Sequence, residues 1–204
     1  MSQFLGPIHM WMYEKIKRQE TITEAICSQA EQYGWTKELN TMLDDTCGAM
    51  VKGDLEQIID VMNIHGWLKH QVDTVESRFA VAVHMIVKEN KEFLSSLKEI
   101  CYADGKEAGS HSASDSSCDV LFEAIGNYLL DGMPCDGGVM TQTEELDEIM
   151  WSVDKNVHAP YWEKAGEDVA VYFTLRDAWL QGFFEGKTVQ YETLGDGTFR
   201  IKEM

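Results

Sequence analysis

The stretch that most constrains this chain lies near its middle, where a long helical pattern becomes apolar on nearly every side. Between residues 68 and 104, apolar side chains recur every three or four positions, as they do along one face of a helix. Residues 80–87, with the sequence AVAVHMIV, interrupt that stripe with a segment that has almost no polar face. A helix of this kind must be covered on more than one side, so we expect residues 80–87 to form the spine of the fold.

Other patterns predict further helices before and after this spine, and strands only near the end of the chain. The predicted helices span about residues 7–33, 36–51, 68–104, 116–130 and 168–184, with a short one after Asp54 and another from Pro160. Gly34, Gly53 and Gly66 are expected to end helices. The low-complexity run of residues 103–117 predicts a loop or a frayed helix end.

The last third of the sequence changes character and predicts a small sheet. Residues 146–153 are typical of a strand, and two alternating runs on either side of Gly195, Asp196 and Gly197 predict a hairpin. The expected fold class is therefore α+β, mainly α, with a helical body and a small antiparallel sheet formed by the C-terminal third. We expect residues 1–204 to form a single domain, in which residues 136–204 complete the helical body of residues 1–135.

Charge and hydropathy exclude several classes of partner. The 204 residues include 17 Lys and Arg against 35 Asp and Glu, which gives a formal net charge of −18. This charge predicts no binding to nucleic acid and no binding to an anionic membrane surface. No window is apolar enough for a membrane span, and the N-terminus has no basic region followed by a long apolar stretch, so we expect no signal peptide. The five cysteines are odd in number and form no CxxC pair, which favours a cytoplasmic protein without disulfides.

Familiar catalytic and metal-binding motifs are absent from the sequence. It contains no Walker loop and no GxGxxG, GxSxG or HExxH pattern, and its six histidines form no HxxxH or ExxH pair. His70 and His84 lie on similar faces of the predicted long helix but are about 20 Å apart along its axis, too far for one metal ion. We therefore predict no metal site and no cofactor.

Single residues suggest where a ligand would bind. His84 lies within the apolar spine, either as a core histidine or as a group that lines a pocket. Arg78 is a further candidate for substrate binding, although we favour a surface pair with Glu76. His9 and Trp11 occupy the first turns of a helix, where backbone N–H groups attract anions.

A cysteine–histidine pair for nucleophilic catalysis is also available. Cys118 and Cys135 flank the predicted helix of residues 116–130, and Cys118 falls in its first turn, where the helix dipole favours a thiolate. The sequence does not show which histidine would reach either thiol. Cys135 is included among the residues expected to contact a substrate.

The C-terminal third resembles the L-2-amino-thiazoline-4-carboxylic acid hydrolase-like family. The matching text is IMWSV at 149–153, KNVH at 155–158, TLRD at 174–177, YETLGD at 191–196 and TFRI at 198–201. The family pattern has cysteine where this chain has His158, Thr174 and Thr198, whereas Asp177 and the Gly-Asp pair at 195–196 are kept. The resemblance implies a hydrolase-like enzyme in which His158 replaces a cysteine as the base and Asp177 orients it or binds the substrate.

These observations lead to three hypotheses. The first is an enzyme that hydrolyses a small cyclic amide, a thiazoline or an amino-acid derivative in a pocket between the helices and the sheet. The second is a non-catalytic ligand-binding or sensory module whose apolar cavity lies beside the spine. The third is a homodimer in which exposed aromatic side chains form the subunit interface. The partner expected in the first two is a small molecule.

Overall fold

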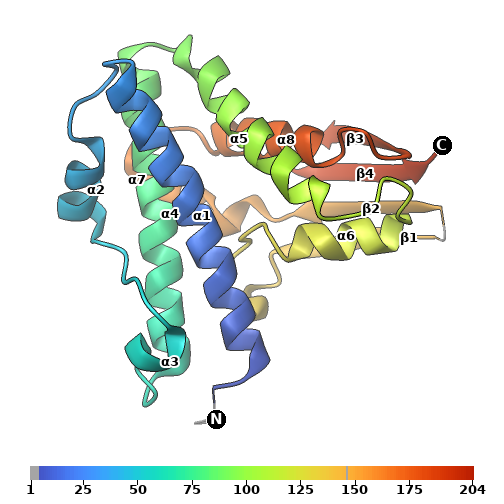
Figure 1. Cartoon of the computed structure of the whole chain (residues 1–204), viewed down its shortest axis with the longest axis horizontal. Helices are drawn as coiled ribbons and strands as arrows, with labels where there is room; N and C mark the ends of the chain where they lie inside the picture. The colour runs from blue at the N-terminus through green and yellow to red at the C-terminus, as the bar shows by residue number, and fades with distance from the viewer. Residues whose placement is uncertain (1–4, 146) are drawn as a thin grey trace.

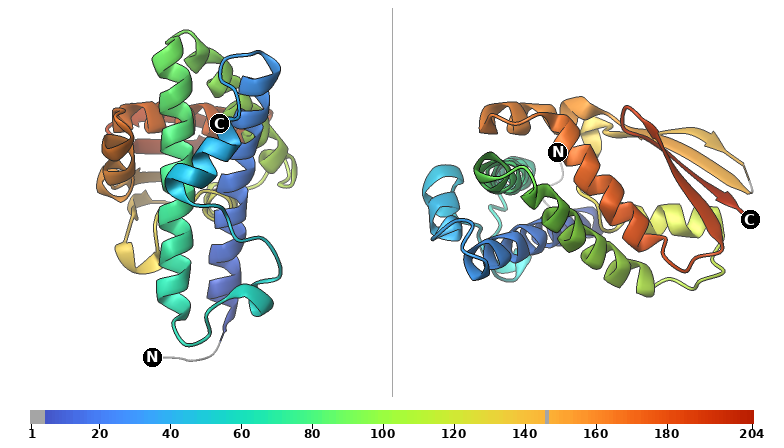
Figure 2. Two further views of the ribbon diagram at one scale, coloured as in Figure 1. Left: turned by 90° about the vertical axis from the view of Figure 1, so that its left-hand side faces the viewer. Right: turned by 90° about the horizontal axis from the view of Figure 1, so that it is seen from above.

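Two helices of 26 residues each, α1 (Pro7–Gln32) and α4 (Ile64–Glu89), lie side by side, away from the strands at the right of Figure 1 (Figures 1 and 2). The computed structural model describes residues 5–145 and 147–204. Pro7 occupies the first turn of α1, where its missing N–H costs nothing, and the Gly6 N–H donates to Nδ1 of His9 at 2.9 Å. Helix α1 packs against α4, and its buried residues include Met12, Lys15, Gln19, Ile22 and Ile26 at heptad-like spacing.

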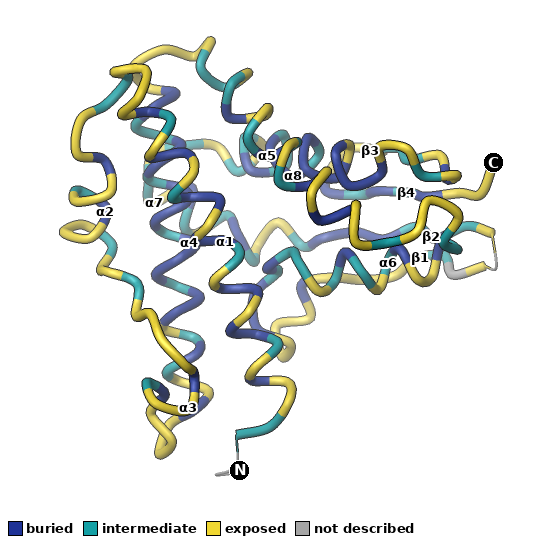
Figure 3. The backbone as a smooth tube through the Cα atoms, viewed as in Figure 1, coloured by how far each residue is buried: buried dark blue, intermediate teal, exposed yellow. Residues whose placement is uncertain are grey.

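Two short helices cover the outer side of this pair. Helix α2 (Leu39–Cys47) inserts Leu39 and Leu43 into the core, and α3 (Leu55–Ile58) inserts Leu55. Most other residues of α2 and of the loop that follows it are exposed (Figure 3). Helix α2 is shorter at both ends than the predicted span of residues 36–51, and α3 is a single short turn after Asp54.

The predicted helix over residues 68–104 is in fact two helices, which corrects the prediction. Helix α4 starts at Ile64, because the Asn63 side chain accepts a hydrogen bond from the Gly66 N–H, so Gly66 lies in its first turn and does not end a helix. Asn90 is extended, with φ −155° and ψ 119°, and its side chain accepts from the Glu92 N–H. This local turn redirects the chain into α5 (Phe93–Ser110). Residues 80–87 remain the buried spine within α4, with Ala80, Ala82, Val83 and Ile86 fully buried.

Close packing of α5 on α8 (Val169–Phe183) explains why α5 continues to Ser110, through residues predicted as a loop. A Cβ atom at Gly105 would lie 2.0 Å from the Trp179 carbonyl oxygen, and one at Gly182 would lie 2.1 Å from the Tyr102 carbonyl oxygen. Only glycine at these positions lets the two backbones approach so closely. The glycines that suggested a loop are therefore the contact surface between two helices.

The four-stranded antiparallel sheet has the order β1-β2-β4-β3. Its strands are β1 (Val139–Glu144), β2 (Glu148–Val153), β3 (Val189–Gly195) and β4 (Thr198–Glu203). The predicted hairpin is β3–β4, and the strand predicted over residues 146–153 is β2, although Leu146 lies outside the described residues. Strand β1 was not predicted, because its sequence VMTQTE lacks a clear apolar alternation.

One face of the sheet is covered by helices. Trp151 of β2 packs against Phe122 of α6 (Cys118–Gly126), and Phe199 of β4 packs under the Arg176 guanidinium of α8. Helix α7 (Ala159–Ala165) packs against α4 on the side away from α1 (Figure 2). One hydrophobic cluster contains residues of the spine, of α5, α6 and α8, and of the sheet. The fold is therefore α+β and mainly α, with its antiparallel sheet in the C-terminal third, as the sequence predicted.

Two further expectations concern the ends and the membrane. The expectation of no signal peptide rests partly on residues 1–4, which lie outside the described residues. Within the described ranges, the structure has no helix that is both long enough and apolar enough to cross a bilayer.

Candidate functional site

The predicted site residues are spread over several parts of the molecule. Their places are the first turns of α1 (His9, Trp11), the middle of α4 (Arg78, His84), a turn before the sheet (Cys135), the turn before α7 (His158) and the exposed side of α8 (Asp177). Only His9 and Cys135 line the same pocket. His84 and His158 line neither of the two largely apolar pockets of the described residues, and Asp177 lines a separate one, so these residues do not share one cavity with His9.

His9 and Cys135 line a largely apolar cavity of about 480 Å³, the His9 pocket, together with Met12, His65, Met133 and Asp136. The Nε2 atoms of His9 and His65 lie 3.3 Å apart. Because Nδ1 of His9 accepts a hydrogen bond from the Gly6 N–H, a neutral His9 carries its proton on Nε2 and donates it to His65. Cys135 is exposed at this pocket.

Trp11 lines a different and larger cavity of about 630 Å³, which we call the Lys15 pocket. Its wall combines the aromatic side chains of Trp11, Phe122 and Trp151 with Lys15, Asp131 and Arg176. The pocket is bounded by α1, α6, strands β1 and β2, and α8. The Trp11 indole N–H donates to Oδ1 of Asn127 at 2.8 Å, which fixes the orientation of this aromatic wall.

Lys15 is the unusual residue of this pocket, since a lysine is rarely buried without an acidic partner. It is 5% exposed, and its Nζ atom lies 4.2 Å from the centre of the Trp11 ring. Over the described ranges, Nζ makes no hydrogen bond and no ion pair. Burial lowers the pKa of Lys15 to about 8, and the attraction of Asp131 only partly opposes this effect.

Asp131 and Arg176 form a buried ion pair at the same pocket. The two guanidinium NH₂ groups donate to Oδ1 and Oδ2 of Asp131 at 2.6 and 3.1 Å. Burial would raise the pKa of Asp131, but Arg176 and His158 hold it well below its usual range. Arg176 also donates to the Tyr172 hydroxyl at 3.0 Å, whereas its Nε is buried without a hydrogen-bond partner among the described residues.

His158 lies behind Asp131 and is completely buried. Its Nδ1 is 3.1 Å from Oε2 of Glu76, its Nε2 is 3.4 Å from Oδ1 of Asp131, and its ring stacks on Tyr172 with the centroids 3.9 Å apart. Burial alone would lower the pKa of His158, but Glu76 and Asp131 raise it to about 9. The ring is then protonated at neutral pH and donates to both carboxylates, so this arrangement gives it no capacity to act as a base there. We call Glu76, Asp131, His158, Tyr172 and Arg176 the His158 cluster.

Asp177 lies apart from His158. Its carboxylate accepts hydrogen bonds from the Tyr191 hydroxyl and the Gln181 amide, each at 2.7 Å. It lines a more polar pocket of about 460 Å³ with Lys155 and Asp168. The described contacts therefore do not support a role for Asp177 in orienting His158.

His84 is half-buried on the spine and faces Glu167. Its Nδ1 lies 3.4 Å from Oε2 of Glu167, and each side chain is 20% exposed. His84 lines neither the His9 pocket nor the Lys15 pocket. The structure thus places it beside the loop after α7, where Gly166 packs against its ring.

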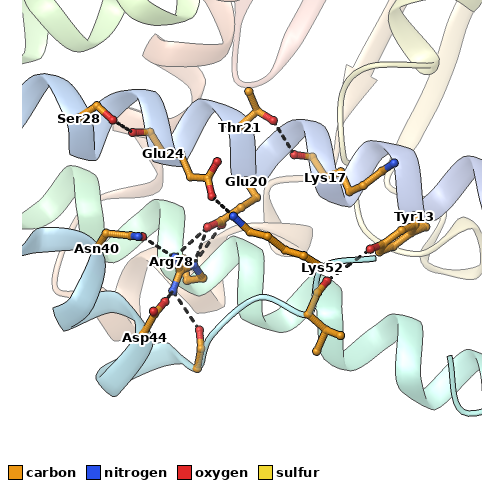
Figure 4. A network of polar contacts seen from close by, with 12 residues as sticks. Tyr13, Lys17, Glu20, Thr21, Glu24, Ser28, Asn40, Asp44, Lys52 and Arg78 are labelled. Carbon is orange, nitrogen blue, oxygen red and sulfur yellow. Dashed lines mark hydrogen bonds and ion pairs between the residues drawn. The ribbon is translucent and has the colours of Figure 1, made fainter. Parts of the chain in front are cut away.

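Arg78 forms a second buried cluster, and the surface pair with Glu76 was a wrong prediction. Arg78 is 2% exposed and its N–H groups are all used, by the Glu20 carboxylate, Asn40 Oδ1, Asp44 Oδ1 and the Gly48 carbonyl (Figure 4). These partners tie α4 to α1 and α2. We call Arg78, Glu20, Asn40 and Asp44 the Arg78 cluster. Glu76 faces the opposite way, toward His158.

Metal ligands and relatives give no further information about the site. Among the described residues, no group of three or more His, Cys, Asp or Glu side chains is placed to hold a metal ion. No protein-family model, curated protein or solved structure matches the chain. The resemblance to the thiazoline hydrolase-like family stays an expectation.

Sequence reasoning missed Lys15 and Asp131, although it had named Arg176 as a local donor for an anionic ligand. For Lys15 a signal existed, because positions 12, 15, 19, 22 and 26 form one heptad-like stripe and a lysine at its second position must be buried with the rest. Arg176 follows the buried Leu175 and lies one turn before the buried Trp179, so its burial was also accessible. Asp131 lies in an irregular segment, where no periodicity indicates burial.

Proposed function

We propose that this chain binds a small anionic molecule with a flat apolar body in the Lys15 pocket. The observation that carries the proposal is Lys15 itself, a buried cation without an acidic partner among the described residues, in a cavity of about 630 Å³. Burying such a charge is unfavourable unless something compensates it, and a ligand carboxylate would do so.

The chemistry of the wall supports the same kind of ligand. Trp11, Phe122 and Trp151 offer apolar surface and ring faces, which suit a flat body. Arg176 adds a second cation to the wall of the pocket. Because the whole chain carries a charge of −18, an anion approaches against the overall field and needs such local cations.

Thermal-shift and calorimetric titrations with benzoate and indole-3-acetate test this proposal. Both anions should raise the melting temperature of the wild-type protein, by an amount that grows with ligand concentration. Benzamide and indole-3-acetamide, which keep the shape but lack the charge, should have a much smaller effect.

Two variants make the test specific to the pocket. Lys15→Met should abolish the difference between the acids and the amides, whereas Lys17→Met should keep it, because Lys17 is 47% exposed and pairs with Glu14 on the outer side of α1. An equal response of the wild type and Lys15→Met to benzoate would refute the proposal.

A hydrolase-like activity is the second candidate, and one observation favours it. Exposed Cys135 and the hydrogen-bonded pair of His9 and His65 line one pocket. A cysteine can act as a thiol nucleophile and a histidine as its base. We infer that such an activity toward thiazolines or cyclic amides would use the His9 pocket and not His158. Cys135→Ser should abolish the activity, while Cys47→Ser, at a half-buried thiol elsewhere, should leave it unchanged.

A further inference from the structure

The Lys15 pocket has a feature that anion binding alone does not require, namely that its cation is a primary amine held away from every described carboxylate. The nearest acidic group of the pocket, Asp131, is already engaged by Arg176 through both oxygens. Lys15 faces an aromatic ring instead, with Nζ 4.2 Å from the Trp11 centroid. An amine in such surroundings loses the solvation and the ion pairing that ordinarily keep it protonated.

We propose that Lys15 is a reactive amine that forms a reversible imine with aldehydes or ketones that carry a carboxylate. This inference rests on the proposed function, since it requires that the Lys15 pocket accept such a molecule. It names a covalent chemistry for the pocket and a narrower ligand class, flat oxo acids.

Imine formation needs no reactant other than the Lys15 amine and the carbonyl compound, and it releases one water molecule. The unprotonated Nζ attacks the carbonyl carbon, one N–H proton passes to the carbonyl oxygen, and the resulting carbinolamine loses water to give the C=N bond. Burial supplies the unprotonated amine, because the pKa of Lys15 is lowered from 10.5 to about 8. When the imine takes up a proton it becomes a cation, and the Trp11 ring face and Asp131 then stabilise that charge.

The pocket also suits the other end of such a ligand. Arg176 lines the same cavity, so a ligand carboxylate would lie near a second cation while a carbonyl group faces Lys15. The aromatic side chains of Trp11, Phe122 and Trp151 line the same cavity and offer ring faces to the flat body of such a ligand.

The experiment uses 4-carboxybenzaldehyde as the reactive probe and 4-(hydroxymethyl)benzoate as its non-reactive counterpart. The full-length protein is incubated with the aldehyde and cyanoborohydride, which reduces an imine to a stable secondary amine, and the labelled lysine is identified by peptide mass spectrometry. Lys15 should be labelled at least about tenfold faster than Lys17, because burial lowers the pKa of Lys15 and leaves more of its amine unprotonated. The unprotonated fraction of Lys15 rises steeply with pH up to about 8, so the labelling rate should rise over the same range.

One variant, Lys15→Arg, and the non-reactive alcohol separate the outcomes. Lys15→Arg keeps the charge but cannot form an imine, so it should bind the alcohol and lose the fast labelling; circular dichroism confirms that it is folded. If the alcohol binds and Lys15 is labelled no faster than Lys17, the imine inference is refuted and the proposed function stands. If the alcohol fails to bind and no lysine is labelled preferentially, both proposals are refuted for this ligand class. Preferential labelling of Lys15 that persists with saturating alcohol would also refute the inference, since the reaction would not occur in the pocket.

Discussion

The Arg78 cluster and the His158 cluster are both buried ionic networks on α4, and they differ in one instructive respect. Every N–H of the Arg78 guanidinium has an acceptor, and its partners come from α1, α2 and the segment that follows α2. The His158 cluster leaves Nε of Arg176 and Oε1 of Glu76 buried without described partners, and it borders the Lys15 pocket. Native proteins satisfy nearly all buried polar groups, so these two atoms set the His158 cluster apart from the fully paired Arg78 cluster.

Charge sharpens the contrast. In the Arg78 cluster one cation faces two carboxylates, of which Asp44 is 42% exposed and can remain hydrated. In the His158 cluster two cations face two carboxylates, and Lys15 adds a third positive charge nearby. The Arg78 cluster is fully paired and structural. The His158 cluster, together with Lys15, carries an excess of positive charge beside the Lys15 pocket.

Removal of Arg78 should produce the largest loss of stability. Arg78→Met leaves the buried Glu20 carboxylate without its cation and should lower the free energy of unfolding by about 3–5 kcal/mol. Urea denaturation measures the change, and Arg78→Met combined with Glu20→Leu should recover a large part of it. Affinity for benzoate should stay unchanged; a parallel loss of binding would show that the Arg78 cluster is not purely structural.

Removal of the Asp131 charge should have the next largest effect. Asp131→Asn keeps the shape but takes the anion away from both Arg176 and His158, which should cost about 2–3 kcal/mol. The exposed Asp115→Asn is the matched control and should change stability by less than about 0.5 kcal/mol. Benzoate binding should become tighter in Asp131→Asn, because Arg176 loses its internal competitor for the ligand; weaker binding would contradict the assignment.

The pH dependence of stability tests the protonation of His158. Its pKa is raised from 6.5 to about 9 in the folded protein, so its stabilising contribution is complete below pH 6.5 and is lost as the pH rises through 9. The wild type should therefore lose about 2 kcal/mol relative to His158→Gln over this interval. Urea titrations of both proteins across the interval measure the difference, and a constant difference would mean that His158 is neutral in the fold.

Replacement of Lys15 should have the smallest effect, and in the opposite direction. The folded pKa of Lys15 is about 8 against 10.5 in the unfolded chain, so its buried charge destabilises the protein below pH 8 and this cost disappears as the pH rises toward 10.5. Lys15→Met should therefore raise the free energy of unfolding by about 1–2 kcal/mol at neutral pH, with a smaller gain in alkaline solution. Lys17→Met should change it by less than about 0.5 kcal/mol; equal effects of both variants would show that Lys15 is hydrated.

The helices and the terminal hairpin were predictable because their signals are local. The apolar stripe of α4, the period of α1 and the glycine turn between β3 and β4 depend on residues within a few positions of one another. The break at Asn90 was harder, since it depends on one side-chain hydrogen bond to Glu92 within a pattern that otherwise continues. The end of α5 was harder still, because Gly105 and Gly109 contact a helix about 75 residues later in the chain.

The candidate site was much less predictable than the fold. The histidines attracted attention because of their residue type, yet His84 and His158 are engaged by Glu167, Glu76 and Asp131, none of which is near in sequence. Lys15 could have been found from its place on the buried stripe of α1, but its lack of an acidic partner could not.

The sequence by itself determined most of the helices, the strand before α7 and the terminal hairpin, and which face of the long helices is apolar. These properties follow from the periodicity and composition of short segments, which can be read directly from the sequence. The tertiary structure alone decided that Arg78 is completely paired while Lys15 is not, and that Lys15, Asp131 and Arg176 meet beside an aromatic pocket. The reason is physical: the desolvation of a charge and the distance to its counterion depend on side chains contributed by helices far apart in sequence, and no local pattern encodes them.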